Sequence, residues 1–285
     1  MFTEQQKIFR PHYEPLKTAE VAQKAVDAAL QMLRKTQSVV LAMGEDHISS
    51  AQNISQALAL KALVANKEKV TLFMELPHNV LSWVLRRRGF QADHVAKLVK
   101  AAAVDNANGH MSARALLDSG RSSFGATLLL TSALYHDVKI VFADAAREYT
   151  DQFVLDLSDS TTREIMKDIG LEKDKIECAK PDGMEVRNRH MTGIIKRELK
   201  KTGGVGILAT GFVHLHGVEE APNVCLHKRS LSALFENACI PSVMVNMCSN
   251  VKFPPDYTAP EKTQRHMFLK PCFSAPLKTE IRACF

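Results

Sequence analysis

The chain has 285 residues, of which 46% are apolar and 24% charged, and its formal net charge is +6. That length allows one large α/β domain or two small ones with a substantial buried core. The basic residues gather only in short clusters, at 86–88 and 196–201. Clusters of this kind are typical of solvated helix faces, so we expect no nucleic-acid partner.

Residues 1–13 are polar and charged and contain no apolar core of a signal peptide. No apolar run reaches the length of about 20 residues that a membrane span needs. The six cysteines show no C-x-x-C spacing, which favours reduced thiols in the core. We therefore expect a soluble, cytoplasmic protein without a membrane span, while secretion by a route without a signal peptide remains open.

Apolar periodicity predicts alternating helices and strands along the chain. In chain order we predict a helix over 18–36, a strand over 38–43, a helix over 48–65, a strand over 70–74, helices over 79–86, 92–103 and 113–134, a strand over 138–143, a helix over 183–201, a strand over 205–209, a helix over 230–237 and a strand over 242–247.

The predicted strands are nearly unbroken apolar runs separated by helices, as in a mostly parallel sheet with helices on both faces. We therefore predict a single α/β domain over residues 1–252. Residues 253–285 are rich in proline and charge, which predicts an irregular C-terminal extension. In such folds ligands bind at the carboxyl ends of the strands.

Polar residues stand where several of these strands end. The sequence Gly-Glu-Asp-His follows the first strand and contains Glu45 and His47, and Gly-Phe-Val-His follows the fourth and ends in His214. Glu75 ends the second strand and Asp144 the third. Imidazoles and carboxylates that meet at one edge can hold a divalent metal or act as general acid and base.

Structural explanations exist for several of these residues. Asp46 could simply cap the following helix, and Asp144 could pair with Arg147 or cap a turn. A lone histidine is often a hydrogen-bonded structural residue. Arg187 differs because it lies on the apolar stripe of its helix, where a charge needs a partner, so we expect it to point towards the acidic strand ends.

Several chemistries are excluded by missing motifs. The chain has no G-x-G-x-x-G after a strand and no G-x-x-x-x-G-K-[ST], so dinucleotide and P-loop chemistry are not expected. It also lacks the G-x-S-x-G elbow of serine hydrolases and the H-E-x-x-H helix of zinc proteases.

The ordered set of motifs resembles a known superfamily. Gly-Glu-x-His at 44–47, Glu75 followed by Pro and Asn, Asp144, Arg-Asn-x-x-Met at 187–191 and Gly-x-x-His at 211–214 occur in this order. The set resembles the superfamily that joins erythromycin esterases, ChaN-like haem-binding lipoproteins and Tiki/PrgY/TraB-like metalloproteases. The resemblance covers roughly residues 38 to 216 as separate short motifs, and it implies an α/β sheet with polar residues at one end.

The resemblance also implies roles for individual residues. His47 would be a general base or metal ligand with Glu45 beside it, and Glu75 would be the second acidic site residue. Arg187 would stabilise an anionic group or oxyanion, and His214 would be the second motif histidine. The chain departs from the pattern at Asn188, where many members have Asp. It also lacks the lipid-anchor cysteine and signal peptide of the haem-binding branch and the membrane segments of the protease branch.

Together these observations predict a hydrolase that cleaves an ester or amide bond of a small-molecule or peptide substrate. The predicted catalytic residues are His47, Glu45, Glu75, Arg187, His214 and Asp144. A divalent metal is possible, with His47, Glu75 and His214 as its ligands. The alternatives are a non-catalytic domain that binds haem or another ligand, with haem less favoured than a metal ion, and a toxin- or effector-type domain of this fold.

Overall fold

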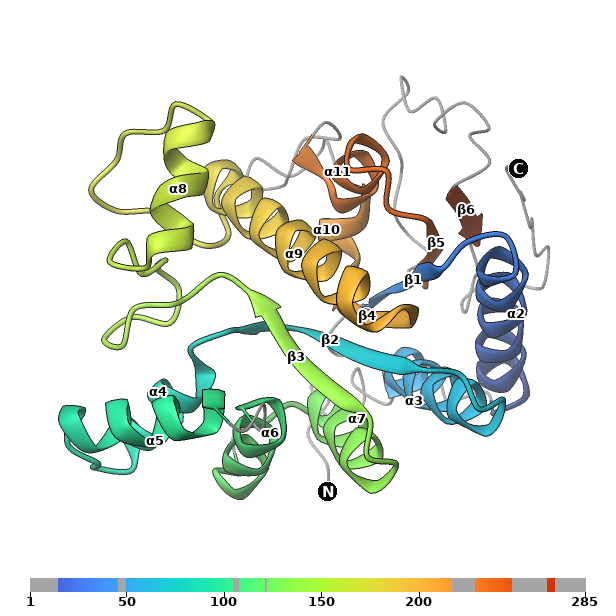
Figure 1. The fold of residues 1–285 in the computed structure, drawn as a ribbon, viewed down its shortest axis with the longest axis horizontal. Helices are drawn as coiled ribbons and strands as arrows, with labels where there is room; N and C mark the ends of the chain where they lie inside the picture. Colours follow the sequence, from blue (N-terminus) through green and yellow to red (C-terminus); the bar gives the residue numbers. More distant parts are fainter. Residues whose placement is uncertain are drawn as a thin grey trace, which may run out of the picture.

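In a computed structural model of the chain, the described residues are 15–45, 50–104, 108–120, 122–216, 229–247 and 266–269. They contain a six-stranded parallel sheet with helices packed on both faces, which confirms the predicted α/β fold (Figure 1). The strands are β1 (Ser38–Glu45), β2 (Val70–Pro77), β3 (Lys139–Asp144), β4 (Gly204–Gly211), β5 (Ser242–Asn246) and β6 (His266–Leu269). The helices are α2 (Pro15–Leu33), α3 (Ser50–Ala65), α4 (Val80–Arg87), α5 (Ala92–Val104), α6 (Asn108–Asp118), α7 (Phe124–Tyr135), α8 (Ser160–Asp168), α9 (Pro181–Thr202), α10 (Phe212–His216) and α11 (Leu231–Asn237).

The order of strands in the sheet is β3-β2-β4-β1-β5-β6. The chain moves outward in one direction from β1 through β2 to β3, and β4 then returns to pair with both β1 and β2. From β4 the chain continues in the opposite direction to β5 and β6. The direction of winding thus reverses at β4, and ligands of open α/β sheets bind next to such reversals, at the carboxyl ends of the strands.

Alternate residues of each strand serve two separate cores, one on each face of the sheet. In β1, Leu41 and Met43 pack with α2, α3 and α7, whereas Val40 and Ala42 pack with α9 and α11. These four side chains are fully buried. Burial on both faces explains why the strands read as continuous apolar runs in the sequence.

The structure refines several predicted boundaries. The predicted helix over 113–134 is divided between α6 and α7, because Gly120 adopts a positive φ of 66° and the Ser123 side chain caps α7 by accepting from the Ala126 N–H. Helices α8 and α10 were not predicted. Strand β6 lies in the segment for which we expected irregular structure, and it pairs with β5.

Two of the six cysteines lie among the described residues, and both are free thiols. Cys178 is buried, as expected for a core thiol, but Cys239 is exposed just after α11 with a φ of 56°. The expectation of core thiols is therefore wrong for Cys239, because a residue in the turn after a short helix faces solvent. Within the described part of the chain, no helix combines the length and apolar character of a membrane span.

Candidate functional site

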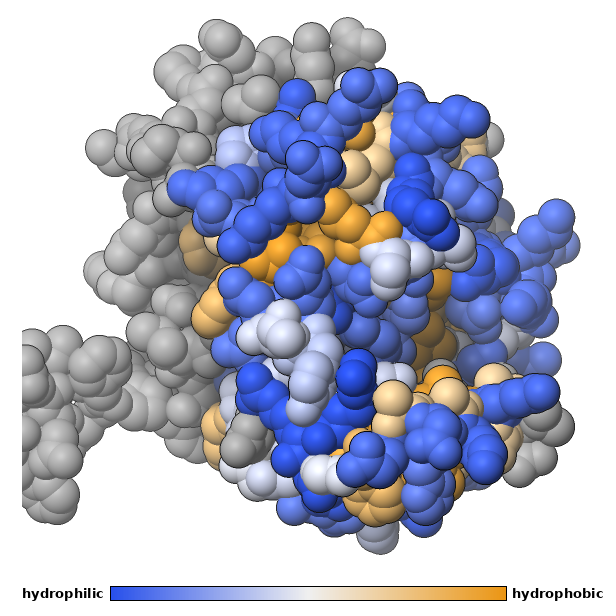
Figure 2. All heavy atoms as spheres, turned by 90° about the vertical axis from the view of Figure 1, so that its left-hand side faces the viewer, coloured by the Kyte–Doolittle hydropathy of each residue, from blue (hydrophilic) through white to orange (hydrophobic). Residues whose placement is uncertain are grey.

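The carboxyl ends of β2, β3 and β4 bring four of the predicted residues together. Glu75 lies near the end of β2 and Asp144 is the last residue of β3. His214 lies in α10, directly after β4, and Arg187 projects from α9. The predicted convergence of these residues is confirmed by the contacts between their side chains. The face of the molecule at this end is largely hydrophilic (Figure 2).

Arg187 is the cation at the centre of this network. Its side chain is 8% exposed, and Nη2 lies 2.5 Å from Glu75 Oε1 and 3.0 Å from Asp144 Oδ2. Nε donates to Asp144, and Nη1 contacts the Cys178 carbonyl and the Met184 sulfur at 3.4 Å each. The prediction that Arg187 points towards the acidic strand ends is confirmed. Every N–H direction of the guanidinium is used within the protein, so Arg187 positions the two acids.

Asp144 is completely buried and is held by two arginines. Arg147 and Arg187 both donate to its Oδ2, and the Ala145 N–H donates to Oδ1 over 2.8 Å. Burial by itself raises the pKa of Asp144, but the charges of Arg187 and Arg147 outweigh it and hold the pKa well below its usual value. The pairing with Arg147 that the sequence suggested is therefore present.

Glu75 joins the two ends of the network. The register between β2 and β3 shifts between Met74 and Pro77, so Glu75 lies in an irregular part of the ladder, where a side chain can be turned aside. Its Oε1 contacts Arg187 and His214, and its Oε2 accepts from the Thr210 hydroxyl over 2.8 Å and the Gly211 N–H over 2.6 Å. Four donors therefore surround one carboxylate.

His214 is buried, and both of its ring nitrogens have partners. Nε2 lies 3.0 Å from Glu75 Oε1, and Nδ1 lies 2.5 Å from the Asn188 Oδ1. The Asn188 Nδ2 donates to the Arg229 carbonyl, so its oxygen faces the ring and Nδ1 must carry a proton. Burial lowers the pKa of His214, although the Glu75 carboxylate favours the charged ring.

Glu45 and His47 complete the predicted set. The Glu45 carboxylate accepts from the Asn53 amide, and Glu45 is aligned with Gly211 in the β1–β4 pairing. It therefore stands beside the strand end whose N–H reaches Glu75. His47 and Asp46 lie outside the described residues, so the predicted metal ligands can be placed only for Glu75 and His214. Those two side chains contact each other, and a metal cation there would compete with the Arg187 guanidinium for Glu75.

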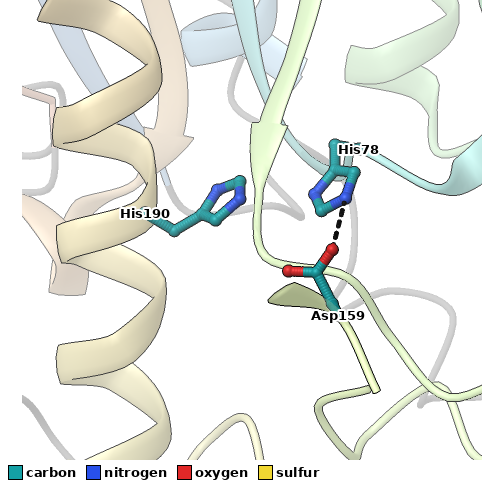
Figure 3. Close-up of side chains that lie close together, drawn as sticks. All are labelled: His78, Asp159 and His190. Atoms are coloured by element: carbon teal, nitrogen blue, oxygen red, sulfur yellow. Dashed lines mark ion pairs between the residues drawn. The ribbon is translucent and has the colours of Figure 1, made fainter. Parts of the chain in front are cut away.

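A second polar cluster lies beside this network, formed by His78, Asp159 and His190 (Figure 3). One potential ligand atom from each residue lies within 4.8 Å of the others. His78 Nε2 is 3.2 Å from Asp159 Oδ1, and the rings of His78 and His190 are nearly parallel, with centroids 4.9 Å apart. This cluster is a candidate metal centre because two imidazoles and a carboxylate are a common ligand set for zinc.

The surroundings of the second cluster define its charge. Burial by itself raises the pKa of Asp159, but hydrogen bonds from His78 and the Thr162 backbone outweigh it and lower the pKa. Burial lowers the pKa of His190, which favours the neutral ring. The cluster therefore combines a carboxylate with an imidazole that is neutral at neutral pH.

The sequence alone predicts no role for this second cluster. None of the predicted site residues belongs to it. The usable signal is spacing: His190 follows Arg187 by three residues on α9, which places both side chains on the same side of the helix. Asp159 caps α8, a helix that was not predicted, so no sequence pattern pointed to it.

Comparison with known proteins gives no family assignment. No known protein family and no curated protein matches the chain. Two solved structures are similar at low sequence identity. A succinoglycan biosynthesis protein has a TM-score of 0.44 and 10% identity, with 79% of this chain and 69% of that chain covered. ChaN of Campylobacter jejuni, which binds haem cofacially, has a TM-score of 0.41 and 15% identity, with 80% and 87% covered.

Proposed function

We propose that this protein is a hydrolase that cleaves ester or amide bonds at the carboxyl edge of its sheet. The observation that supports this proposal best is the contact of 3.0 Å between His214 Nε2 and Glu75 Oε1. Because Nδ1 of the same ring is already a donor, this contact requires a proton between the imidazole and the carboxylate. A His–carboxylate pair that holds one proton is suited to general acid–base catalysis.

Both ring nitrogens of His214 are bonded within the protein, so its proton reaches a leaving alcohol or amine only when the contact with Glu75 opens. Burial lowers the pKa of His214, and an imidazolium with a lowered pKa is a stronger acid than a free one, which suits this transfer. His47, two residues beyond Glu45, keeps its predicted role as the base that accepts a proton from the attacking water. Attack by water breaks the acyl bond, and the leaving group departs with the proton from His214.

The other residues of the network have a positioning role in this proposal. Asp144 and Arg187 hold Glu75, because Arg187 bridges the two carboxylates. Thr210 and Gly211 fix the second Glu75 oxygen. This arrangement replaces the substrate-binding role that the resemblance implied for Arg187, since its guanidinium is already bonded within the protein.

The test is hydrolysis of a panel of aryl esters with short and long acyl chains, together with aryl amides. We expect turnover by the full chain, and we expect it to fall about 100-fold or more in His47→Ala, Glu75→Gln and His214→Gln. Glu75→Gln keeps the shape of the side chain and removes its charge. His94→Ala is the matched control, because His94 is exposed on α5, away from the network.

Thermal unfolding of each variant separates loss of catalysis from loss of fold. Wild-type turnover in folded His47→Ala or Glu75→Gln would show that the assigned roles are wrong. Titration with haem tests the binding alternative: a stoichiometric Soret band in a protein that hydrolyses none of the esters or amides would replace the hydrolase proposal.

A further inference from the structure

One nitrogen of the His190 ring is held by the backbone, and the ring extends towards the second cluster. Its Nδ1 lies 2.8 Å from the Ala143 carbonyl, which can only accept, so Nδ1 carries the proton. The lone pair of the neutral ring is therefore on Nε2. A histidine whose other nitrogen is fixed by a backbone carbonyl is the usual arrangement of a metal ligand. In Figure 3 this imidazole extends from α9 towards His78.

His78 lies against the carboxylate of the cluster and leaves one ring nitrogen without a partner. Its Nε2 faces Asp159 Oδ1, while Nδ1 is buried and has no hydrogen-bond partner among the described residues. A buried polar atom without a partner destabilises the folded state, so the cluster is incompletely satisfied as it stands. A cation held between His78 and Asp159 would take the place of the hydrogen bond between Nε2 and Oδ1, so that both atoms direct a lone pair at the ion.

Asp159 supplies the negative charge of the cluster and is itself fixed. Its Oδ2 accepts from the Thr162 N–H over 2.8 Å and from the Thr162 hydroxyl over 3.1 Å. Each carboxylate oxygen has more than one lone-pair direction, so these bonds leave capacity for a cation. The side chain of His78 is 33% exposed and that of Asp159 is 17% exposed, so solvent reaches the cluster.

From these observations we propose that His78, Asp159 and His190 bind a divalent transition-metal ion of the zinc type. Zinc binds imidazole nitrogen and carboxylate oxygen at about 2.0–2.2 Å, so the three donors must move closer together than their present spacing. The ligand set has three protein groups, and a tetrahedral ion keeps its fourth position for water. This ion would be distinct from the one predicted at His47, Glu75 and His214.

The proposal goes beyond the hydrolase and is independent of it. Metal binding can occur without ester cleavage, and the acid–base pair of Glu75 and His214 can act without a metal. A binding measurement therefore tests the metal site alone, whereas the ester and amide panel tests the hydrolase.

The experiment is a titration of the chelator-treated full chain with Co²⁺, followed by its visible absorption, and then competition by Zn²⁺. We expect one ion per chain with the intense bands of tetrahedral coordination. His78→Asn, Asp159→Asn and His190→Gln should each weaken binding about tenfold or more. His94→Asn and Cys239→Ser are controls, because both residues are exposed and could bind metal nonspecifically.

Two results would overturn the proposal. One is a wild-type protein that binds neither Co²⁺ nor Zn²⁺ in this titration. The other is a His78→Asn variant that binds the metal with wild-type affinity. If His214→Gln then removes binding, the ion lies at the network of Glu75 and His214 instead. His78→Asn serves as the deciding variant where His190→Gln fails to fold, because His78 is partly exposed whereas His190 is buried.

Discussion

Glu75 and Arg187 are 112 positions apart in the chain, and a contact of 2.5 Å between Oε1 and Nη2 joins them. The contact ties the end of β2 to α9. Three residues further along each segment stands a histidine, His78 after Glu75 and His190 after Arg187, and these two rings lie 4.9 Å apart. The buried ion pair thus fixes the two segments that carry most of the second cluster.

Substitution of Asp144 should destabilise the fold strongly. Asp144→Asn removes the charge that Arg147 and Arg187 share, which leaves buried guanidinium groups with one acid fewer. Breaking a buried pair in this way costs about 3–5 kcal/mol. We expect a loss of that size in the free energy of unfolding measured with urea. Asp137→Asn is the control, because the Asp137 side chain is 97% exposed, and it should change the value little.

The same carboxylate predicts how stability depends on pH. The pKa of Asp144 is lower in the folded protein than in the unfolded chain, where it is about 3.9. Above about pH 4 the charged Asp144 carboxylate contributes fully to the free energy of unfolding. At lower pH the Asp144 of the unfolded chain is protonated before that of the folded protein, so the free energy of unfolding falls. Urea unfolding between pH 7 and pH 3 should show a steeper acid loss in the wild type than in Asp144→Asn. Equal slopes would mean that Asp144 does not carry this dependence.

Two glycines of α9 should respond in opposite directions to alanine. A Cβ at Gly183 would lie 2.1 Å from the Glu177 carbonyl oxygen, so the first turn of α9 would have to move. We expect Gly183→Ala to destabilise the protein by about 1–3 kcal/mol. A Cβ at Gly193 meets no described atom within 4 Å, and Gly193→Ala should stabilise the helix by about 0.5–1 kcal/mol. Urea unfolding of both variants checks the two signs, and a loss at Gly193 would contradict the explanation.

Asn188→Asp should change the protonation of His214. The new carboxylate would face Nδ1 of the ring, and a negative charge there raises the pKa of His214 relative to the wild type. It would also remove the donor to the Arg229 carbonyl, at a cost of about 1–3 kcal/mol. NMR titration of the histidine ring nitrogens measures the shift.

The matched substitution for that experiment is Asn66→Asp. Asn66 is exposed, and its amide donates to the Ala62 carbonyl within the same helix region. Asn66→Asp adds one negative charge, as Asn188→Asp does, but away from His214. The pKa of His214 should therefore stay at its wild-type value in this variant. An identical shift in both variants would point to net charge rather than to the local contact.

Much of the fold could be predicted because the signals for it are local. The apolar runs of β1 and β4 show strands buried on both faces, and the periodicity of α9 shows a helix. Arg187 was informative for the same reason, since a charge on an apolar stripe must find a partner wherever the chain folds. Helix α8 could not be predicted in this way, because its sequence is polar and only the Asp159 cap fixes its start.

The site was only partly predictable. Strand-end placement was enough to group Glu75, Asp144 and His214, because parallel strands share one carboxyl edge. The number of donors to Glu75 was not visible in the sequence, since it depends on the register shift after Met74 and on the Thr210 and Gly211 groups of a neighbouring strand.

The sequence by itself determined that the strands would be apolar on both faces and that Arg187 would need acids near it, because apolar character and charge are properties of each residue and its immediate neighbours. Only the tertiary structure decided that Arg187 bridges Glu75 and Asp144 and that His78, Asp159 and His190 meet. Those contacts join segments that are far apart in the chain. Their geometry comes from strand order and helix packing, which no local pattern encodes.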